Sequence, residues 1–284
     1  MTNQSPGPDL TARQCALCGV ETNTPHGTCP VCADERQYLA ADGVQRWSSP
    51  AEQAARGAAI ELRELEPGLW ALDTCGHVGI GQQAKLVITD RGNVLVDVPA
   101  YIDGAATEAV RALGGIAAIV PSHPHMFGVQ SAWSAAFDDA PVWVSGPDAG
   151  WVARGFPGLR VWSGELEPVP GVRASQPGGH FPGSSVVHFR GADGAGVLLS
   201  GDTIAAVPRA GWVSFMRSFP NRLPLSAGVV RRIAAHVADR YDVERLYDNF
   251  EGRVQRGAGE AIASSAERYA RWVSGEFDHL TGPG

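Results

Sequence analysis

Ser122-His123-Pro124-His125-Met126-Phe127-Gly128 follows directly on the apolar run of residues 115–120. That run is strand-sized and bounded by glycine and proline, so it predicts a short buried strand. Two histidines two residues apart at the end of a strand can direct their imidazoles toward one point. Neutral imidazole is a common ligand for zinc, iron, copper and nickel. The stretch therefore indicates a candidate metal site at one edge of a core sheet.

Two further glycine-rich turns each carry a candidate metal ligand. One is Gly178-Gly179-His180-Phe181-Pro182-Gly183-Ser184. The other, Leu198-Leu199-Ser200-Gly201-Asp202-Thr203, again follows an apolar strand. A lone histidine of this kind is more often a buried, hydrogen-bonded core residue than a ligand. The histidine pair gains force as a candidate metal site from these two turns.

The order of these motifs resembles the metallo-β-lactamase-fold superfamily over residues 64–284. The resemblance implies an α+β fold, a four-layer αββα sandwich, whereas the helix and strand pattern alone indicates only mixed α and β structure. It also implies that the active-site metal ligands are His123, His125, His180 and Asp202. Asp202 is in addition the candidate catalytic residue. Asp97, at the end of a strand, matches the buried aspartate that supports the ligands from behind.

Two features depart from the usual pattern of this superfamily. The first motif normally continues with an aspartate and a histidine, but here those places hold Phe127 and Gly128. The late histidine is also missing from residues 246–252. In dinuclear members these side chains hold a second ion, so we expect a mononuclear active site.

The aromatic-rich segment of residues 211–221 follows the Gly-Asp turn closely and suggests a substrate pocket. Ordinary core packing is an equal alternative, because cores and pockets use the same residue types. The candidate pocket residues are Met126, Phe127, Trp212, Phe215, Met216, Arg217 and Glu251.

Four of the five cysteines form two Cys-x-x-Cys pairs near the N-terminus, Cys15/Cys18 and Cys29/Cys32, separated by ten residues. This spacing fits a tetrahedral site of four thiolates, which has no open position for a substrate. We therefore expect a structural metal, zinc, with a rubredoxin-like iron as the alternative. Two disulfides are the other interpretation, and the absence of a secretory signal argues against them.

Length and composition limit the class of protein. The 284 residues are 44% hydrophobic and 19% charged, which is enough for one large core and a small appendage. A net charge of −7 argues against nucleic acid as a partner, and no apolar run is long enough to cross a membrane. We expect a cytoplasmic protein with a small-molecule substrate; the oligomeric state is left open.

The chain is expected to have four parts. They are a flexible N-terminus (1–13), a four-cysteine metal-binding knuckle (14–35), a connector (36–63) and a metallo-β-lactamase-like domain (64–284). Within the domain, the pattern predicts a hairpin around Asp90-Arg91-Gly92. It also predicts a strand at residues 245–247 and helices near residues 102–113, 148–154, 226–238 and 259–275.

The leading functional hypothesis is a metal-dependent hydrolase that acts on a small, partly apolar molecule. Zinc at the site would lower the pKa of bound water to about 7 and supply a hydroxide nucleophile. Asp202 would bind the metal or orient that hydroxide as a general base. Iron and manganese are the alternative metals.

Two other functions stay open. His123, His180 and Asp202 also form the 2-His-1-carboxylate set of non-haem iron enzymes, which resembles the iron site of the persulfide dioxygenases in this superfamily. A mononuclear iron oxygenase or a lyase is therefore one alternative. The other is a catalytically silent binding or regulatory protein. Hydrolysis leads by analogy with the superfamily, since hydrolases dominate it.

Overall fold

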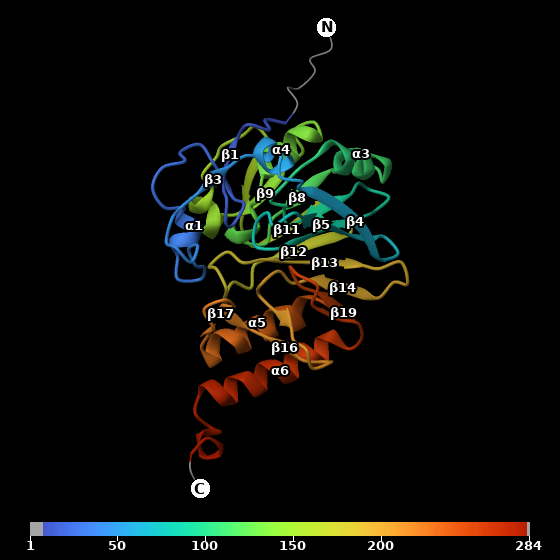
Figure 1. The fold of residues 1–284 in the computed structure, drawn as a ribbon. Coiled ribbons are helices and arrows are strands. Elements are labelled where there is room, and N and C mark those ends of the chain that lie inside the picture. The colour runs from blue at the N-terminus through green and yellow to red at the C-terminus, as the bar shows by residue number, and fades with distance from the viewer. Residues whose placement is uncertain (1–7, 283–284) are drawn as a thin grey trace.

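The computed structural model describes residues 8–282 and places two β-sheets between two layers of helices (Figure 1). In spatial order, the first sheet contains β10 (Leu159–Trp162), β9 (Val142–Ser145), β8 (Ala118–Val120), β7 (Val94–Val96), β6 (Gln83–Val87), β5 (Leu69–Cys75) and β4 (Ala59–Glu66). The second sheet contains β11 (Glu165–Val169), β12 (Val172–Ser175), β13 (Val186–Arg190), β14 (Gly196–Leu199), β19 (Arg245–Tyr247) and β20 (Arg253–Val254). This layering confirms the predicted α+β sandwich.

Alternation of side chains along the strands explains how the layers hold together. In β14, Leu199 contributes to the core between the sheets, whereas Leu198 packs against the helices on the other side. In β7, Val96 faces the core between the sheets and Leu95 faces the opposite helical layer. Successive residues of a strand point to opposite faces. A strand that is apolar throughout therefore joins two cores and is buried on both faces.

The helices cover the outer faces of the sandwich. α3 (Gly104–Ala112) and α4 (Gln130–Ala136) lie on the first sheet, and α5 (Ala227–Arg240) and α6 (Ala258–Val273) lie on the second (Figure 1). The Asp103 side chain caps α3 by accepting a hydrogen bond from the Ala106 backbone N–H at 2.7 Å.

Most predicted elements of the main domain are confirmed. They include three of the four helices, the hairpin formed by β6 and β7, and the strand β19. The helix predicted near residues 148–154 is a 3₁₀ helix, η2 (Gly146–Trp151), and the sequence pattern did not predict α4. No helix within residues 8–282 combines the length and the apolar character needed to cross a membrane.

Short elements complete the fold at its N-terminal side and around the second sheet. They are β1 (Arg13–Cys15), β2 (Glu21–Thr22), α1 (Pro30–Ala33), β3 (Trp47–Ser48), α2 (Pro50–Ala54), η1 (Pro124–Met126), β15 (Ala205–Ala206), β16 (Val213–Ser214), β17 (Met216–Ser218), β18 (Leu223–Pro224) and η3 (Asp278–Leu280). Residues 1–7 of the predicted flexible N-terminus lie outside the described part of the chain. β4 includes residues 59–63, which the sequence pattern placed in the connector.

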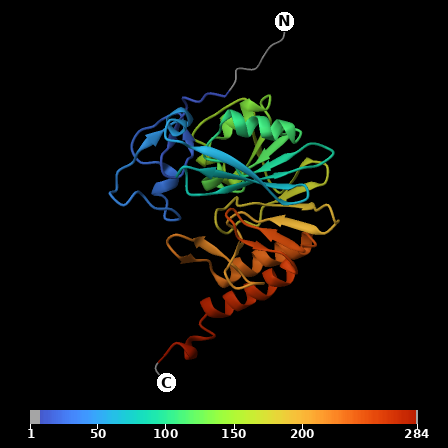
Figure 2. The same cartoon turned by 45° about the vertical axis from the view of Figure 1, so that its right-hand side comes forward.

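The four-cysteine knuckle lies beside the sandwich and shares its core (Figure 2). The Sγ atoms of Cys15 and Cys32 are 3.6 Å apart, and those of Cys18 and Cys29 are 3.8 Å apart. Four sulfurs at about 2.3 Å from one zinc ion would be about 3.8 Å from one another, so the spacing fits a tetrahedral metal site. All four thiols are free and buried, which argues against the disulfide interpretation. The Gln45 amide adds an N–H donor 3.2 Å from the sulfur of Cys15.

A buried glutamate also anchors the knuckle to the main domain. Glu21 of β2 is 2% exposed and accepts a hydrogen bond from the Ser131 backbone N–H of α4 at 2.7 Å. The Arg154 side chain lies 3.7 Å away, too far for a tight ion pair. Burial is the largest influence on this carboxyl group and raises the pKa of Glu21 to about 7. Knuckle docking is therefore linked to protonation.

Loss of a knuckle cysteine is expected to destabilise the whole fold, because metal binding supplies folding free energy to a segment that shares the main core. Cys29→Ser should lower the free energy of unfolding by about 3 kcal/mol or more, as loss of a metal is among the largest single-residue effects. Cys75→Ser, outside the cluster, is the matched control and should melt like the wild type. Thermal denaturation followed by circular dichroism measures both, and an unchanged melting temperature for Cys29→Ser would refute the structural role.

The raised pKa of Glu21 predicts a pH dependence of stability. The folded state favours the protonated carboxyl, so its contribution is complete below about pH 4.5 and is lost as the pH rises through about 7. The shift corresponds to at most about 3 kcal/mol. In urea denaturation from pH 4.5 to 8, the stability of wild type relative to Glu21→Gln should fall with pH. Replacing the exposed Glu64 by Gln should leave the wild-type slope in place. A constant difference between wild type and Glu21→Gln would contradict the linkage.

Candidate metal centre

The three histidines and the aspartate meet where strands of both sheets end. His123 and His125 lie in the turn after β8, Asp202 lies in the turn after β14, and His180 lies in the turn between β12 and β13. Each of the four offers a ligand atom, and these atoms all lie within 4.8 Å of one another. All four residues are buried, and they come from turns that follow strands of both sheets, so the cluster lies where the two sheets meet.

The distances within the cluster match the donor spacing of a single metal ion. His123 Nε2 is 3.4 Å and His180 Nε2 is 3.7 Å from Asp202 Oδ2. His180 Nε2 is 3.3 Å from His125 Nδ1. Four donors at about 2.0–2.1 Å from one tetrahedral ion would be about 3.4 Å apart. These three distances are close to the spacing of ligands that share one ion.

Protonation states at neutral pH also suit a divalent cation. Burial lowers the pKa of His125 well below its usual range and that of His180 to about 4. Burial alone would raise the pKa of Asp202, but the close His123 ring and the other histidines lower it to about 2. Neutral imidazole rings and an ionised carboxylate are the forms that bind metal.

The outer ring nitrogens are held so that the inner ones face the centre. His123 Nδ1 lies 3.0 Å from Ser122 Oγ, and His180 Nδ1 lies 3.1 Å from the Met216 carbonyl oxygen. His123 Nε2 is buried and lies 3.4 Å from Asp202 Oδ2, without a well-aligned hydrogen bond to any residue that the structure describes. A buried polar atom without a partner is costly, and a metal ion would satisfy it.

Asp97 supports the centre indirectly. Its Oδ1 accepts a hydrogen bond from the Ser122 backbone N–H at 2.7 Å, and Ser122 in turn contacts His123. The Asp97 backbone has a φ of 63°, in the left-handed region. Asp97 is not among the four clustered residues, so it orients the turn that carries the first two histidines.

A further contact, which the sequence pattern did not predict, runs from Arg36 to the backbone of the His180 turn. Arg36 lies just after the knuckle and is 6% exposed. Its Nε donates a hydrogen bond to the His180 carbonyl oxygen at 2.7 Å, and its guanidinium lies 4.1 Å from the centre of the Phe181 ring. Asp34 holds the other side of the guanidinium at 2.6 Å. The knuckle and the candidate centre are therefore joined by one buried side chain.

A pocket of about 130 Å³ opens beside the cluster and gives it access to solvent. Its lining residues are Gln37, Tyr38, Ile80, His125, His180, Asp202, Phe219, Pro220 and Phe250. Among them, only the three candidate ligands were predicted site residues. The glycine-rich turn of residues 76–81 is the one feature of the sequence that could have pointed to this pocket, because it brings Ile80 to the pocket lining.

The residues predicted to form the substrate pocket lie elsewhere. Met126, Phe127 and Phe215 are fully buried core residues, and Phe215 packs against α5 and α6. Trp212 lies under the guanidinium of Arg268, at 3.3 Å. These residues therefore serve core and surface packing, which was the alternative to a substrate pocket in the sequence analysis.

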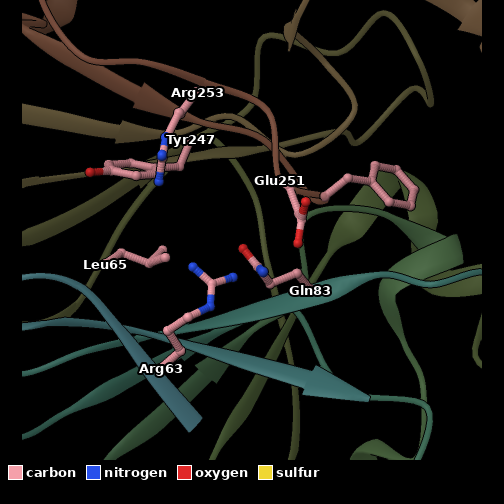
Figure 3. A pocket seen from close by; sticks show the side chains of 7 residues that line it. Arg63, Leu65, Gln83, Tyr247, Glu251 and Arg253 are labelled. Carbon is pink, nitrogen blue, oxygen red and sulfur yellow. The ribbon is translucent and has the colours of Figure 1, made fainter. Parts of the chain in front are cut away.

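The remaining three predicted pocket residues also have other contacts. Met216 offers its backbone carbonyl to His180, and Arg217 forms an ion pair with Glu35. Glu251 is exposed and lines a separate hollow between the edges of the two sheets (Figure 3). That hollow is lined by Arg63, Leu65, Gln83, Tyr247, Phe250, Glu251 and Arg253.

The structure gives a physical reason for the missing second set of ligands. Gly128 has a φ of 48°, and a Cβ there would lie 2.4 Å from the Pro99 carbonyl oxygen. No side chain fits at that position without a backbone shift. Asp248 accepts hydrogen bonds from the backbone N–H groups of Phe250, Gly252 and Ala206 and so is committed to its own loop. Within residues 8–282, only the four-cysteine group and the His/Asp group gather metal-binding side chains.

A relative in another organism matches almost the whole chain in sequence. The chain is 38% identical over 271 residues to the uncharacterized protein YmaE of Bacillus subtilis (strain 168), covering 93% of this chain and 98% of YmaE. No family model matches the chain.

Solved structures of metallo-β-lactamases superpose on most of the chain. A B3 metallo-β-lactamase with an active-site glutamic acid matches with a TM-score of 0.53, 17% identity, and coverage of 82% of this chain and 96% of that one. The DIM-1 metallo-β-lactamase matches with a TM-score of 0.55, 13% identity, and coverage of 74% and 99%. The enzyme from Erythrobacter litoralis matches with a TM-score of 0.52, 18% identity, and coverage of 74% and 96%. At these identities the likeness concerns the fold. The chain thus belongs to the same family as YmaE, and it has the fold of the metallo-β-lactamases with a four-cysteine knuckle at its N-terminal side.

Proposed function

We propose that the protein is a metal-dependent hydrolase that acts on a small, partly apolar molecule at a mononuclear centre. The observation that carries the proposal is the buried His123, His125, His180 and Asp202 cluster, with its donor spacing and the unpartnered Nε2 of His123. The adjoining pocket has room for a small ligand.

The proposed chemistry uses the residues of the cluster in distinct roles. A zinc ion held there would lower the pKa of a bound water molecule to about 7. The three imidazoles act as neutral donors, and the low pKa of Asp202 keeps its carboxylate ionised, so that it can bind the ion or orient the bound water by a hydrogen bond. Ser122 and the Met216 carbonyl fix the orientations of the histidine rings, and so limit reorganisation during the reaction.

We propose zinc for both sites. Four buried thiols at tetrahedral spacing suit zinc, and a rubredoxin-like iron would use the same sulfurs. At the His/Asp centre, iron and manganese are the competing metals. Reduced, clustered thiols also support the cytoplasm as the compartment.

An iron oxygenase or lyase is the competing activity. It would need only His123, His180 and Asp202, as a 2-His-1-carboxylate set. The Nδ1 atom of His125 is 3.3 Å from His180 Nε2, within the same cluster, and adds a third nitrogen donor. Three imidazole donors, with the Asp202 carboxylate beside an open position, resemble the ligand set of catalytic zinc sites and so favour hydrolytic chemistry over an iron triad.

Removing two histidines should empty the centre and spare the knuckle. Elemental analysis is expected to find two metal ions per wild-type chain and one per chain of His123→Ala/His180→Ala. His26→Ala, an exposed histidine outside both clusters, is the control and should retain both ions. If the double variant keeps two ions, the histidines are not ligands and the protein is better described as a binding scaffold.

Asp202→Asn should abolish most hydrolysis of small neutral esters, thioesters and lactones. The variant keeps the size of the side chain but removes the charge and the proton acceptor, so we expect a loss of about 100-fold or more in kcat/KM. The wild-type rate should rise with pH to a plateau with an apparent pKa of about 7. Steady-state assays across pH measure both effects. Oxygen consumption with no ester hydrolysis would instead support the iron enzyme.

A further inference from the structure

One wall of the pocket comes from the segment just C-terminal to the knuckle. Gln37 and Tyr38 line the pocket together with His125, His180 and Asp202. In Figure 1, α1 and β17 lie on the same side of the molecule, where this segment meets the β17–β18 hairpin. The knuckle segment is therefore part of the entrance to the centre.

The main chain of this wall is held firmly by the hairpin. The Asn221 side-chain amide donates hydrogen bonds to the carbonyl oxygens of Glu35 at 2.9 Å and Gln37 at 2.7 Å. Ser218 Oγ donates to the Arg36 carbonyl oxygen at 2.9 Å. These bonds use the backbone acceptors of the segment and leave the Gln37 side chain free to face the pocket.

The Gln37 side chain is buried without satisfying its polar atoms. Gln37 is 6% exposed, and its Oε1 is buried with no hydrogen-bond partner among the described residues. A buried amide oxygen without a partner costs about 1–3 kcal/mol. Gln37 lines the pocket, so a ligand or an ordered water can pair with its amide once the side chain turns toward the bound molecule.

Apart from a metal ion at the centre, the side chains around the pocket offer no positive charge to an anionic ligand. Asp202 contributes a carboxylate, and no lysine or arginine is among the lining residues. Arg36 is committed to Asp34 and to the His180 carbonyl, and Arg217 is committed to Glu35. Carboxylate and phosphate groups are usually recognised by arginine or lysine donors, which this pocket lacks.

The remaining surface is apolar and small. Tyr38, Ile80, Phe219, Pro220 and Phe250 supply most of the lining. A cavity of about 150 Å³ lined by apolar side chains is known to bind benzene, which sets the scale of a group that fits in about 130 Å³.

We propose that this pocket binds an uncharged small molecule whose hydrogen-bonding group pairs with the Gln37 amide, while its apolar part packs on Phe219 and Phe250. Gln37 is then a positioning residue that selects neutral amide-like or ester-like substrates over carboxylates and phosphates. This inference rests on the proposed metal centre and names the substrate class that the centre would serve.

Two thiols of equal size and different charge test the proposal without a known substrate. Thiolates bind Co²⁺, so 2-mercaptoacetamide and mercaptoacetate can be titrated against the cobalt-loaded protein. Difference spectra against cobalt-loaded His123→Ala/His180→Ala remove the signal of the four-cysteine site. We expect the neutral amide to bind about tenfold or more tightly than the acid in the wild type.

The Gln37→Leu variant tests the positioning role. It should weaken 2-mercaptoacetamide about fivefold to tenfold, the loss expected for one hydrogen bond, and leave ethanethiol unchanged. Gln255→Leu, an exposed glutamine outside this pocket, is the matched control and should bind all three thiols like the wild type.

The outcomes distinguish a failure of the proposed ligand class or of the role of Gln37 from a failure of the proposed metal centre. Equal or tighter binding of mercaptoacetate in the wild type would overturn the assignment of an uncharged ligand, with no variant needed. Unchanged affinity of Gln37→Leu for 2-mercaptoacetamide would overturn the role of Gln37. No difference spectrum between wild type and the double histidine variant would instead refute the metal centre itself.

Discussion

Burial of the Asp202 carboxylate among three imidazole rings is the constraint on which the rest of the structure depends. A carboxylate and three ring nitrogens in the seam between two sheets have little water to satisfy them. The surrounding contacts compensate by holding the outer nitrogens of His123 and His180 and leaving the inner donors aimed at one point. Ser122, Met216 and Arg36 each contribute a single hydrogen bond to this arrangement. The backbone around Gly128 leaves no room for a ligand side chain at that position.

Local signals in the sequence were enough for most elements of the main domain, although they missed α4. The apolar runs before His123 and Asp202 are strands because both of their faces are buried, and the turns after them carry the polar residues. Glycine-rich turns at the ends of strands are visible in a sequence without any alignment. The order of these turns, which resembles that of the metallo-β-lactamase-fold superfamily, is why the clustered residues could be named. The aromatic segment of residues 211–221 had no such guide and could not be divided correctly. Phe215 faces the helices and Phe219 faces the pocket, although both lie in the same short stretch.

The contacts that the sequence could not predict join distant parts of the chain. Arg36 and His180 are 144 residues apart, and Asn221 reaches the backbone of Gln37 over 184 residues. Such pairs leave no periodic pattern in either segment. The knuckle was expected to be a separate structural module, because the spacing of its cysteines carries no information about the position of residues 36–38. In the folded protein its C-terminal continuation is a wall of the pocket, so the knuckle and the pocket are parts of one packed unit.

The same long-range contacts impose an order on assembly during synthesis. The four cysteines leave the ribosome first and can collect their ion while most of the chain is still missing. Asp202 and the hairpin that anchors the Arg36 segment emerge much later, at a synthesis rate of about 5–20 residues per second. The His/Asp centre therefore closes only after the knuckle has had several seconds or more to take up metal. Two sites with different donors would thus sample the cellular metal pool at different times, the sulfur site first and the nitrogen site last.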